Sequence, residues 1–126
     1  MNKKGRKWAM DKELKDKLVE CGFDVDTTLQ RFMGNETLYF KFLKKLPADQ
    51  NYKAFIEAVE KEDCEAAFRS GHTLKGVMSN LGVDGALQIL VPMVEKLRAN
   101  EAEGLQEELK EFRDRYEKAI VCIESL

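Results

Sequence analysis

The last part of the chain carries one long apolar stripe that constrains the fold more than any other feature. Its large apolar side chains recur at steps of three and four residues: Leu105, Leu109, Phe112, Tyr116, Ile120 and Ile123. This spacing puts them on one face of a helix predicted over 101–124, about 24 residues or about 36 Å long. Such a stripe requires other elements to cover it.

Similar stripes recur along the rest of the 126-residue chain, and strand-like alternation is hard to find. They predict helices over 11–21, 26–33, 36–46, 50–61, 63–81 and 84–99. The expected N-caps are Asp26, Asn35, Asp49 and Asp63, with Asn100 and Glu103 as a capping-box start for the last helix. The expected stops are Gly22, Gly34, Pro47 and Gly82.

The inward faces of these helices follow from the same spacing. They comprise Leu14, Leu18, Cys21; Leu38, Tyr39, Phe42, Leu43, Leu46; Tyr52, Phe55, Ile56, Val59; Ala67, Gly71, Leu74, Met78, Leu81; and Leu87, Leu90, Val91, Val94, Leu97. The small Ala67 and Gly71 would let another helix approach closely. Pro92 lies inside the 84–99 helix and should bend it, at a typical cost of ~3 kcal/mol.

The helix pattern predicts an all-α fold. Helices 63–81, 84–99 and 101–124, with a fourth assembled from 36–61, form an antiparallel four-helix bundle with additional short N-terminal helices. Residues 11–126 are expected to be one domain. Residues 1–10 are expected to be a flexible N-terminal arm, from which Trp8 packs back onto the body.

Composition narrows the functional classes. The content of 44% hydrophobic and 35% charged residues is that of a soluble globular protein. A net charge of −2 gives no bulk reason to expect nucleic acid or an anionic membrane as partner. No run approaches the ~18 apolar residues of a membrane span. Three cysteines without C-x-x-C spacing favour free thiols in a reducing compartment, so we expect a cytoplasmic protein. We also expect it to be a monomer.

His72 is the single histidine, and helical spacing places it opposite the inward stripe of the 63–81 helix. Lys75 and Gly76 follow at i+3 and i+4 and share its face. A neutral imidazole has one nucleophilic nitrogen, and Lys75 can neutralise a phosphoryl group beside it. Gly76 costs roughly 0.5–1 kcal/mol in mid-helix but clears space for a partner. A solvated lysine and a packing glycine are the plainer alternatives.

Other chemistries fit these residues less well. One histidine without C-x-x-C or H-x-x-x-H spacing does not make an ordinary structural zinc site. Gly71 to Gly76 has the spacing of a phosphate loop, but Val77 stands where that motif requires lysine. No activating acid lies at a convincing spacing for a Cys–His nucleophile. We therefore expect no cofactor or metal bound by this chain.

The segment His72-Thr73-Leu74-Lys75-Gly76, followed by Asn80-Leu81-Gly82, closely resembles the H-x-L-K-G…L-G signature of histidine-containing phosphotransfer (HPt) domains. Leu29 to Tyr39 resembles the segment before the bundle in bacterial members. The likeness covers about residues 22–124.

This resemblance implies a phosphocarrier of a multistep two-component phosphorelay, without intrinsic kinase activity. His72 would accept a phosphoryl group from the aspartate of one response-regulator receiver domain and pass it to another. Lys75 would be the assisting cation, and Gly76 would give the receiver access. Phe68, Arg69 and Ser79, on the same face, are expected to dock the partner.

The resemblance places Mg²⁺ in the receiver and not in this chain. A hybrid histidine kinase is a further candidate partner. A start at Met1 favours a stand-alone carrier over a fragment of such a kinase.

One position departs from the family pattern. Many members carry Glu or Gln on the following helix, hydrogen-bonded to the imidazole, and here Val94 stands at that position with Glu95 beside it. Either the hydrogen bond is absent, or Pro92 rotates Glu95 into place. Two other functions stay open: a helical adaptor that binds receivers or kinases without phosphotransfer, and a structural bundle that oligomerises through the 101–124 stripe.

Overall fold

The fold is all-helical in the computed structural model, which describes residues 10 and 12–126. The helices are α1 (Lys12–Glu20), α2 (Val25–Arg31), α3 (Glu36–Leu43), the 3₁₀ turn η1 (Leu46–Ala48), α4 (Gln50–Glu60), α5 (Cys64–Leu81), α6 (Asp84–Arg98) and α7 (Gln106–Glu124). No strand occurs in this described part of the chain, and the predicted fold class is confirmed.

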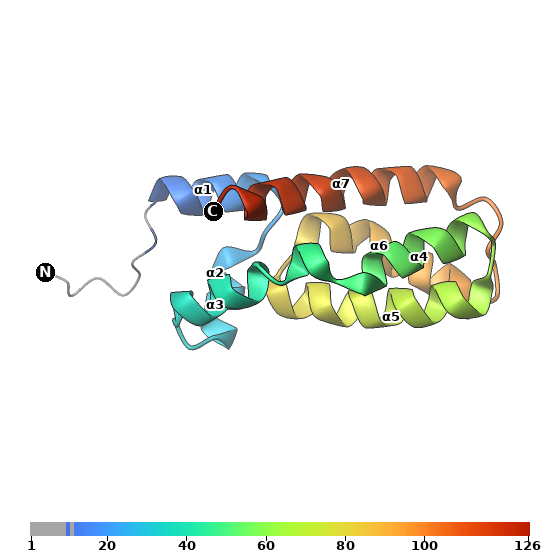
Figure 1. The fold of residues 1–126 in the computed structure, drawn as a ribbon, viewed down its shortest axis with the longest axis horizontal. Coiled ribbons are helices and arrows are strands. Elements are labelled where there is room, and N and C mark those ends of the chain that lie inside the picture. Colours follow the sequence, from blue (N-terminus) through green and yellow to red (C-terminus); the bar gives the residue numbers. More distant parts are fainter. Residues whose placement is uncertain (1–9, 11) are drawn as a thin grey trace, which may run out of the picture.

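Helices α4 to α7 form the antiparallel bundle, and α1, α2 and α3 lie at one end of it (Figure 1). Its core takes fully buried side chains from all four helices: Phe55, Leu74, Leu90 and Phe112 are each 0% exposed. The inward stripe predicted for α5 is buried along its whole length, from Ala67 to Leu81. This burial fixes which face of α5 is turned to solvent.

Gly71 packs closely against side chains of both α4 and α6. A Cβ atom at this position would lie 2.8 Å from a ring carbon of Phe55 in α4 and 3.1 Å from a methyl carbon of Val94 in α6. The expectation that a small residue here lets another helix come close is confirmed for both neighbours.

The N-terminal helices are tied to the turn between α5 and α6. The Asp24 amide donates to the Gly82 carbonyl at 2.8 Å, and the Gly85 amide donates to the Gly22 carbonyl at 2.9 Å. Gly82 has φ +71, and a Cβ atom there would lie 2.1 Å from the Thr28 hydroxyl oxygen. Only glycine combines this left-handed backbone with so little space.

Three of the predicted N-caps are confirmed and one is wrong. The side chains of Asn35, Asp49 and Asp63 accept hydrogen bonds from the first turns of α3, α4 and α5. Helix α2, however, is capped by Asp24, which accepts from the Thr27 amide at 3.2 Å, and not by Asp26.

Two early helices are shorter than predicted. Helix α2 ends at Arg31 because Met33 and Gly34 both have positive φ angles. Helix α3 ends at Leu43, and Pro47 lies in the first turn of η1, where its missing amide hydrogen costs nothing.

The start predicted for the last helix is wrong. Asn100 has φ 63 and Gly104 has φ 74, so both residues interrupt the helix, and α7 begins at Gln106 without a side-chain cap. It has 19 residues, with Leu109, Phe112, Tyr116 and Ile123 buried as predicted and Ile120 half-buried.

Burial differs from the prediction at a few positions. Val91 and Phe42, expected inside, are 37% and 39% exposed. Both lie at the borders of their apolar faces, where periodicity alone does not decide which side of the border a residue takes. Leu14, Cys21, Leu38, Tyr52 and Leu87 are half-buried.

The predicted arm at 1–10, with Trp8, lies outside the described residues except for Met10, which packs against the core. In the part of the chain that the structure describes, no helix combines the length and apolar character needed to cross a bilayer.

Candidate functional site on the outer face of α5

His72 lies near the middle of α5, and its side chain is exposed. Its neighbours Gly71 and Leu74 are buried in the bundle, so the helix turns His72 away from the core. The bundle therefore presents the single imidazole to solvent, as the periodicity predicts.

The ring of His72 stacks on the ring of Phe68, one turn earlier. The ring centroids are 5.7 Å apart and the planes are inclined by 25°. Phe68 is half-buried against the core, and the Arg98 guanidinium carbon lies 5.0 Å from its ring centroid. The imidazole is thus part of a contact chain that reaches the last residue of α6.

The two residues considered as hydrogen-bond partners of the imidazole are both occupied elsewhere. Val94 is 0% exposed and packs against Gly71. Glu95 is exposed and pairs with Arg98, with 3.4 Å between Oε1 and Nε. Among the described residues, no hydrogen bond to the His72 ring is present. Rotation of Glu95 onto the imidazole is not observed.

Lys75 and Gly76 lie on the His72 side of α5, and Lys75 is half-buried. A Cβ atom at Gly76 would have no other atom within 4 Å, so the helix surface there is open. This openness contrasts with Gly71, and packing between helices does not account for a glycine at position 76. What the arrangement offers is an imidazole beside a cation and an uncovered stretch of backbone.

The three predicted docking residues lie in different surroundings. Arg69 is exposed and pairs with Glu65 at 3.0 Å. The Ser79 carbonyl accepts a hydrogen bond from Arg31 of α2 at 2.9 Å. The Phe68 ring contacts the His72 ring of α5 and the Arg98 guanidinium of α6.

A groove of about 420 Å³ lies between the C-terminal part of α5 and the α2 and α3 region. Its lining residues are Arg31, Phe32, Phe42, Lys45, Val77, Asn80 and Leu81. The Phe32 and Phe42 rings stack with 5.7 Å between centroids, and the Lys45 amino group lies 5.1 Å from the Phe42 ring centroid. The groove is apolar at its base and carries two cations.

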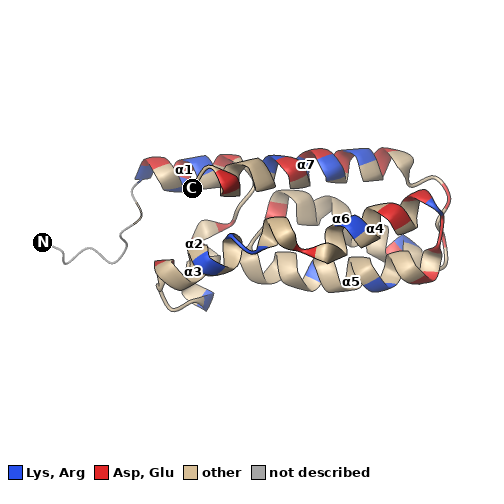
Figure 2. Ribbon diagram, in the orientation of Figure 1, with Lys and Arg blue, Asp and Glu red and all other residues tan. Residues whose placement is uncertain are grey.

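The charges near this surface are mostly positive. From Ala66 to Val83 the chain has two charged residues, Arg69 and Lys75, and no acidic one. Figure 2 shows α5 largely uncharged along its middle, with red segments gathered where α4 joins α5. A partner with an anionic site would find complementary charge here.

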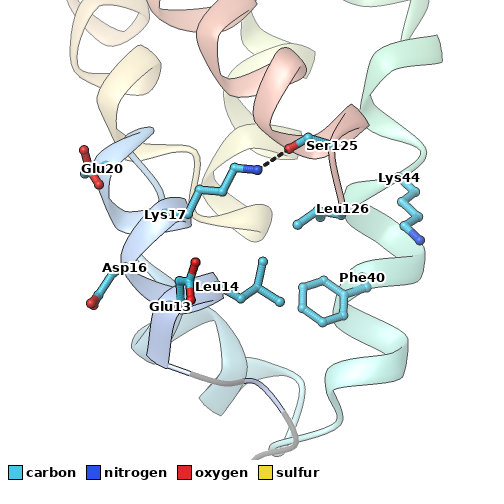
Figure 3. Close-up of a pocket in the computed structure, with 9 residues that line it drawn as sticks. All are labelled: Glu13, Leu14, Asp16, Lys17, Glu20, Phe40, Lys44, Ser125 and Leu126. Carbon is cyan, nitrogen blue, oxygen red and sulfur yellow. Dashed lines mark hydrogen bonds between the residues drawn. The ribbon is translucent and has the colours of Figure 1, made fainter.

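Other hollows lie away from the histidine. The space between α1, α3 and the C-terminal end of α7 is lined by Leu14, Lys17, Phe40 and Leu126, among others, and Lys17 donates to the Ser125 hydroxyl at 2.6 Å (Figure 3). Within residues 10 and 12–126, no group of three or more His, Cys, Asp or Glu side chains is placed to hold a metal ion.

Sequence reasoning missed Arg98 and Lys45. Arg98 is at the end of the predicted helix, and its contact with Phe68 depends on the antiparallel register of α5 and α6, which spacing along one helix does not reveal. Lys45 lies with Lys44 between α3 and η1, and this pair of lysines gave no signal by itself.

Comparison with known families gives one match. A family model described as Hpt domain covers residues 42–120, which include His72, Lys75 and Gly76 and exclude the Leu29–Tyr39 stretch. No curated protein and no solved structure matches the chain significantly.

Proposed function

The chain belongs to the Hpt domain family, and we propose that it is a phosphocarrier that accepts a phosphoryl group on His72 from one receiver and passes it to another. Hpt domains have a phosphotransfer role in phosphorelays and interact with receiver domains and histidine kinases. The single observation that carries the assignment to His72 is its exposure in mid-α5, beside Lys75 and an open backbone at Gly76.

The proposed step is a direct transfer between two side chains. The neutral imidazole nitrogen attacks phosphorus, a P–N bond forms, and the P–O bond to the receiver's aspartate breaks to leave a carboxylate. Passing the group onward reverses this step with a second receiver. Because phosphoryl transfer requires little covalent chemistry from the protein, the chain contributes chiefly position and charge.

Each residue of the site has a proposed role. Lys75 offsets the negative charge of the phosphoryl group. Gly76 lets the receiver's backbone come close to the imidazole. The receiver supplies the acidic cluster and the Mg²⁺, so this chain acts as a carrier without a kinase activity of its own.

The test is phosphotransfer from a set of purified receivers carrying radiolabelled aspartyl phosphate. At least one receiver should transfer label to the wild-type chain, and His72→Gln should abolish labelling. Thr73→Val, on the exposed neighbour, should keep it. If no receiver transfers label, but one binds wild type and His72→Gln equally, the protein is an adaptor and the proposal fails.

We also propose that the groove between the C-terminal part of α5 and α2 and α3 is part of the receiver's docking surface. A receiver some 30 Å across would cover both the groove and His72, because His72 and Asn80 are eight residues apart, or about 12 Å along the helix. The cations Arg31 and Lys45 at the groove suit the acidic phosphoacceptor end of a receiver.

Charge reversal tests this docking surface. Lys45→Glu should raise the KM for the receiver by about three- to tenfold and leave the saturating transfer rate unchanged, because a rim charge acts mainly on association. The matched control is Lys53→Glu, an exposed lysine of α4 outside the groove. Equal KM values for the two variants would contradict docking at the groove.

A further inference from the structure

Val94 has no side chain that could hydrogen-bond to the His72 ring. Another contact must therefore orient the imidazole. Val94 is buried against Gly71, and Glu95 is held by Arg98. An exposed histidine with free rotation about its side-chain bonds would present its nucleophilic nitrogen in the wrong direction most of the time. Such rotational disorder would lower the rate of phosphotransfer, because this reaction depends on how the nucleophilic nitrogen is placed.

We propose that Phe68 is the positioning residue for the His72 imidazole, and that Arg98 acts through it. This inference rests on the proposed function of His72. The geometry that carries it is the chain of contacts Glu95–Arg98–Phe68–His72, which joins the end of α6 to the middle of α5.

The stack between Phe68 and His72 follows from helix geometry. Long side chains on a helix lean towards its N-terminus, so a residue at i covers the turn that holds i−4. His72 therefore leans over Phe68, and their ring centroids lie 5.7 Å apart, within the range of offset stacking. A stacked imidazole loses much of its freedom to rotate.

Phe68 can restrict the His72 ring because the Phe68 ring has packing contacts of its own. Its ring is half-buried against the bundle core, and Arg98 lies 5.0 Å from its centroid. Arg98 also pairs with Glu95, three residues earlier on α6. The aromatic ring is thus supported by the core and by a cation from a second helix.

The stack also decides which side of the imidazole a receiver meets. Phe68 covers the side towards the start of α5, and the other direction leads to Gly76, where no atom would contact an added Cβ. The open approach to His72 is therefore from the Gly76 side. Lys75, three residues after His72, also lies towards the C-terminal end of α5.

The first test is spectroscopic and requires no receiver. In wild type, the ring current of Phe68 should shift the carbon-bound ring protons of His72, and Phe68→Leu should remove that shift. Phe40→Leu, a half-buried aromatic residue of α3, is the matched control and should leave the His72 protons unchanged. If the His72 ring protons resonate at the same positions in Phe68→Leu as in wild type, the stack is overturned.

The second test is kinetic. Phe68→Leu should lower the saturating transfer rate from the receiver by about three- to tenfold, which corresponds to the interaction energy of one aromatic pair. The KM should stay unchanged. Phe68→Tyr should restore the rate. A rate unchanged in Phe68→Leu, or a loss that Phe68→Tyr does not restore, would overturn a positioning role for the ring.

A double-variant cycle tests the part assigned to Arg98. Arg98→Met alone should lower the rate about twofold, consistent with a weak cation–aromatic contact at an exposed site. In the Phe68→Leu background the same change should have no further effect, since Arg98 acts through Phe68. An additive loss would show that Arg98 acts independently and would overturn that part.

The outcomes separate this inference from the proposed function. If the wild-type chain accepts no phosphoryl group, the function fails, whatever the spectra show. If transfer occurs but Phe68→Leu changes neither the spectrum nor the rate, the function stands and the positioning role of Phe68 is wrong.

Discussion

At the scale of single residues, the two glycines of α5 near His72 have opposite surroundings. Gly71 packs against side chains of α4 and α6, and an added Cβ would be 2.8 Å from the Phe55 ring. Gly76 faces open space. One glycine is thus required by packing, and the other weakens the helix for no benefit to the fold.

Alanine substitutions separate these two roles. Gly76→Ala should raise the free energy of unfolding by about 0.5–1 kcal/mol, because it removes the helix penalty of glycine, and should slow phosphotransfer from a receiver. Gly71→Ala should lower the free energy of unfolding by about 1–3 kcal/mol through overpacking. Urea denaturation and the transfer assay measure both. Faster or unchanged transfer in Gly76→Ala would contradict the access role.

The residues of the site differ in how far the sequence could predict them. The exposure of His72 follows from the burial of a stripe on the same helix, which periodicity alone reveals. The contact of Arg98 with Phe68 joins residues 30 positions apart, and only the register between two helices brings them together. Local spacing therefore predicted the exposed histidine and missed the contact between Phe68 and Arg98.

At the scale of helices, the N-terminus of α2 shows how two neighbouring acids can have different roles. Asp24 accepts a hydrogen bond from the Thr27 amide, and its own backbone pairs with Gly82. Asp26 lies inside the helix and pairs with Lys15 at 2.7 Å, with both side chains well exposed. The cap is therefore two residues before the predicted one.

Matched alanine variants test this assignment. Asp24→Ala should lower the free energy of unfolding by about 1 kcal/mol, since an amide of the first turn loses its partner. Asp26→Ala should change it by only a few tenths, because exposed ion pairs contribute little. Thermal or urea denaturation of both variants decides between them. A larger loss for Asp26→Ala would restore the sequence-based assignment.

Helix ends were predicted less well than helix faces, for a physical reason. The apolar stripe of α7 is set by steps of three and four, and its predicted positions from Leu109 to Ile123 are buried as expected except for the half-buried Ile120. Its start depends on the left-handed backbone of Asn100 and Gly104, which ends any helix through 101–105. Asn100 and Glu103 match a capping box in sequence, yet that pattern does not reveal the backbone angles.

At the scale of the whole molecule, the core buries phenol groups contributed by separate helices. Tyr39 of α3 is 0% exposed and Tyr116 of α7 is 2% exposed. Within the described residues, neither hydroxyl has a hydrogen-bond partner. Burial raises the pKa of both phenols well above the ordinary value, and it raises the pKa of Tyr52 to about 12.

These pKa shifts make folding sensitive to high pH. In the unfolded chain a tyrosine loses its proton near pH 10, whereas in the folded bundle it keeps that proton to a higher pH. The folded state therefore binds more protons above pH 10, and the free energy of unfolding must fall as pH rises. Each fully shifted tyrosine contributes a slope of about 1.4 kcal/mol per pH unit, and below about pH 9 the contribution is constant.

The double variant Tyr39→Phe, Tyr116→Phe isolates this effect from the titration of exposed lysines, which both proteins share. Urea denaturation from pH 9 to pH 12 should show wild type losing stability more steeply than the variant, by about 3 kcal/mol per pH unit at the alkaline end. At pH 7 the two should differ little, because each substitution removes a buried hydroxyl that has no partner in the described chain. Parallel curves across this range would mean that the two phenols reach solvent in the folded protein, against their burial in the structure.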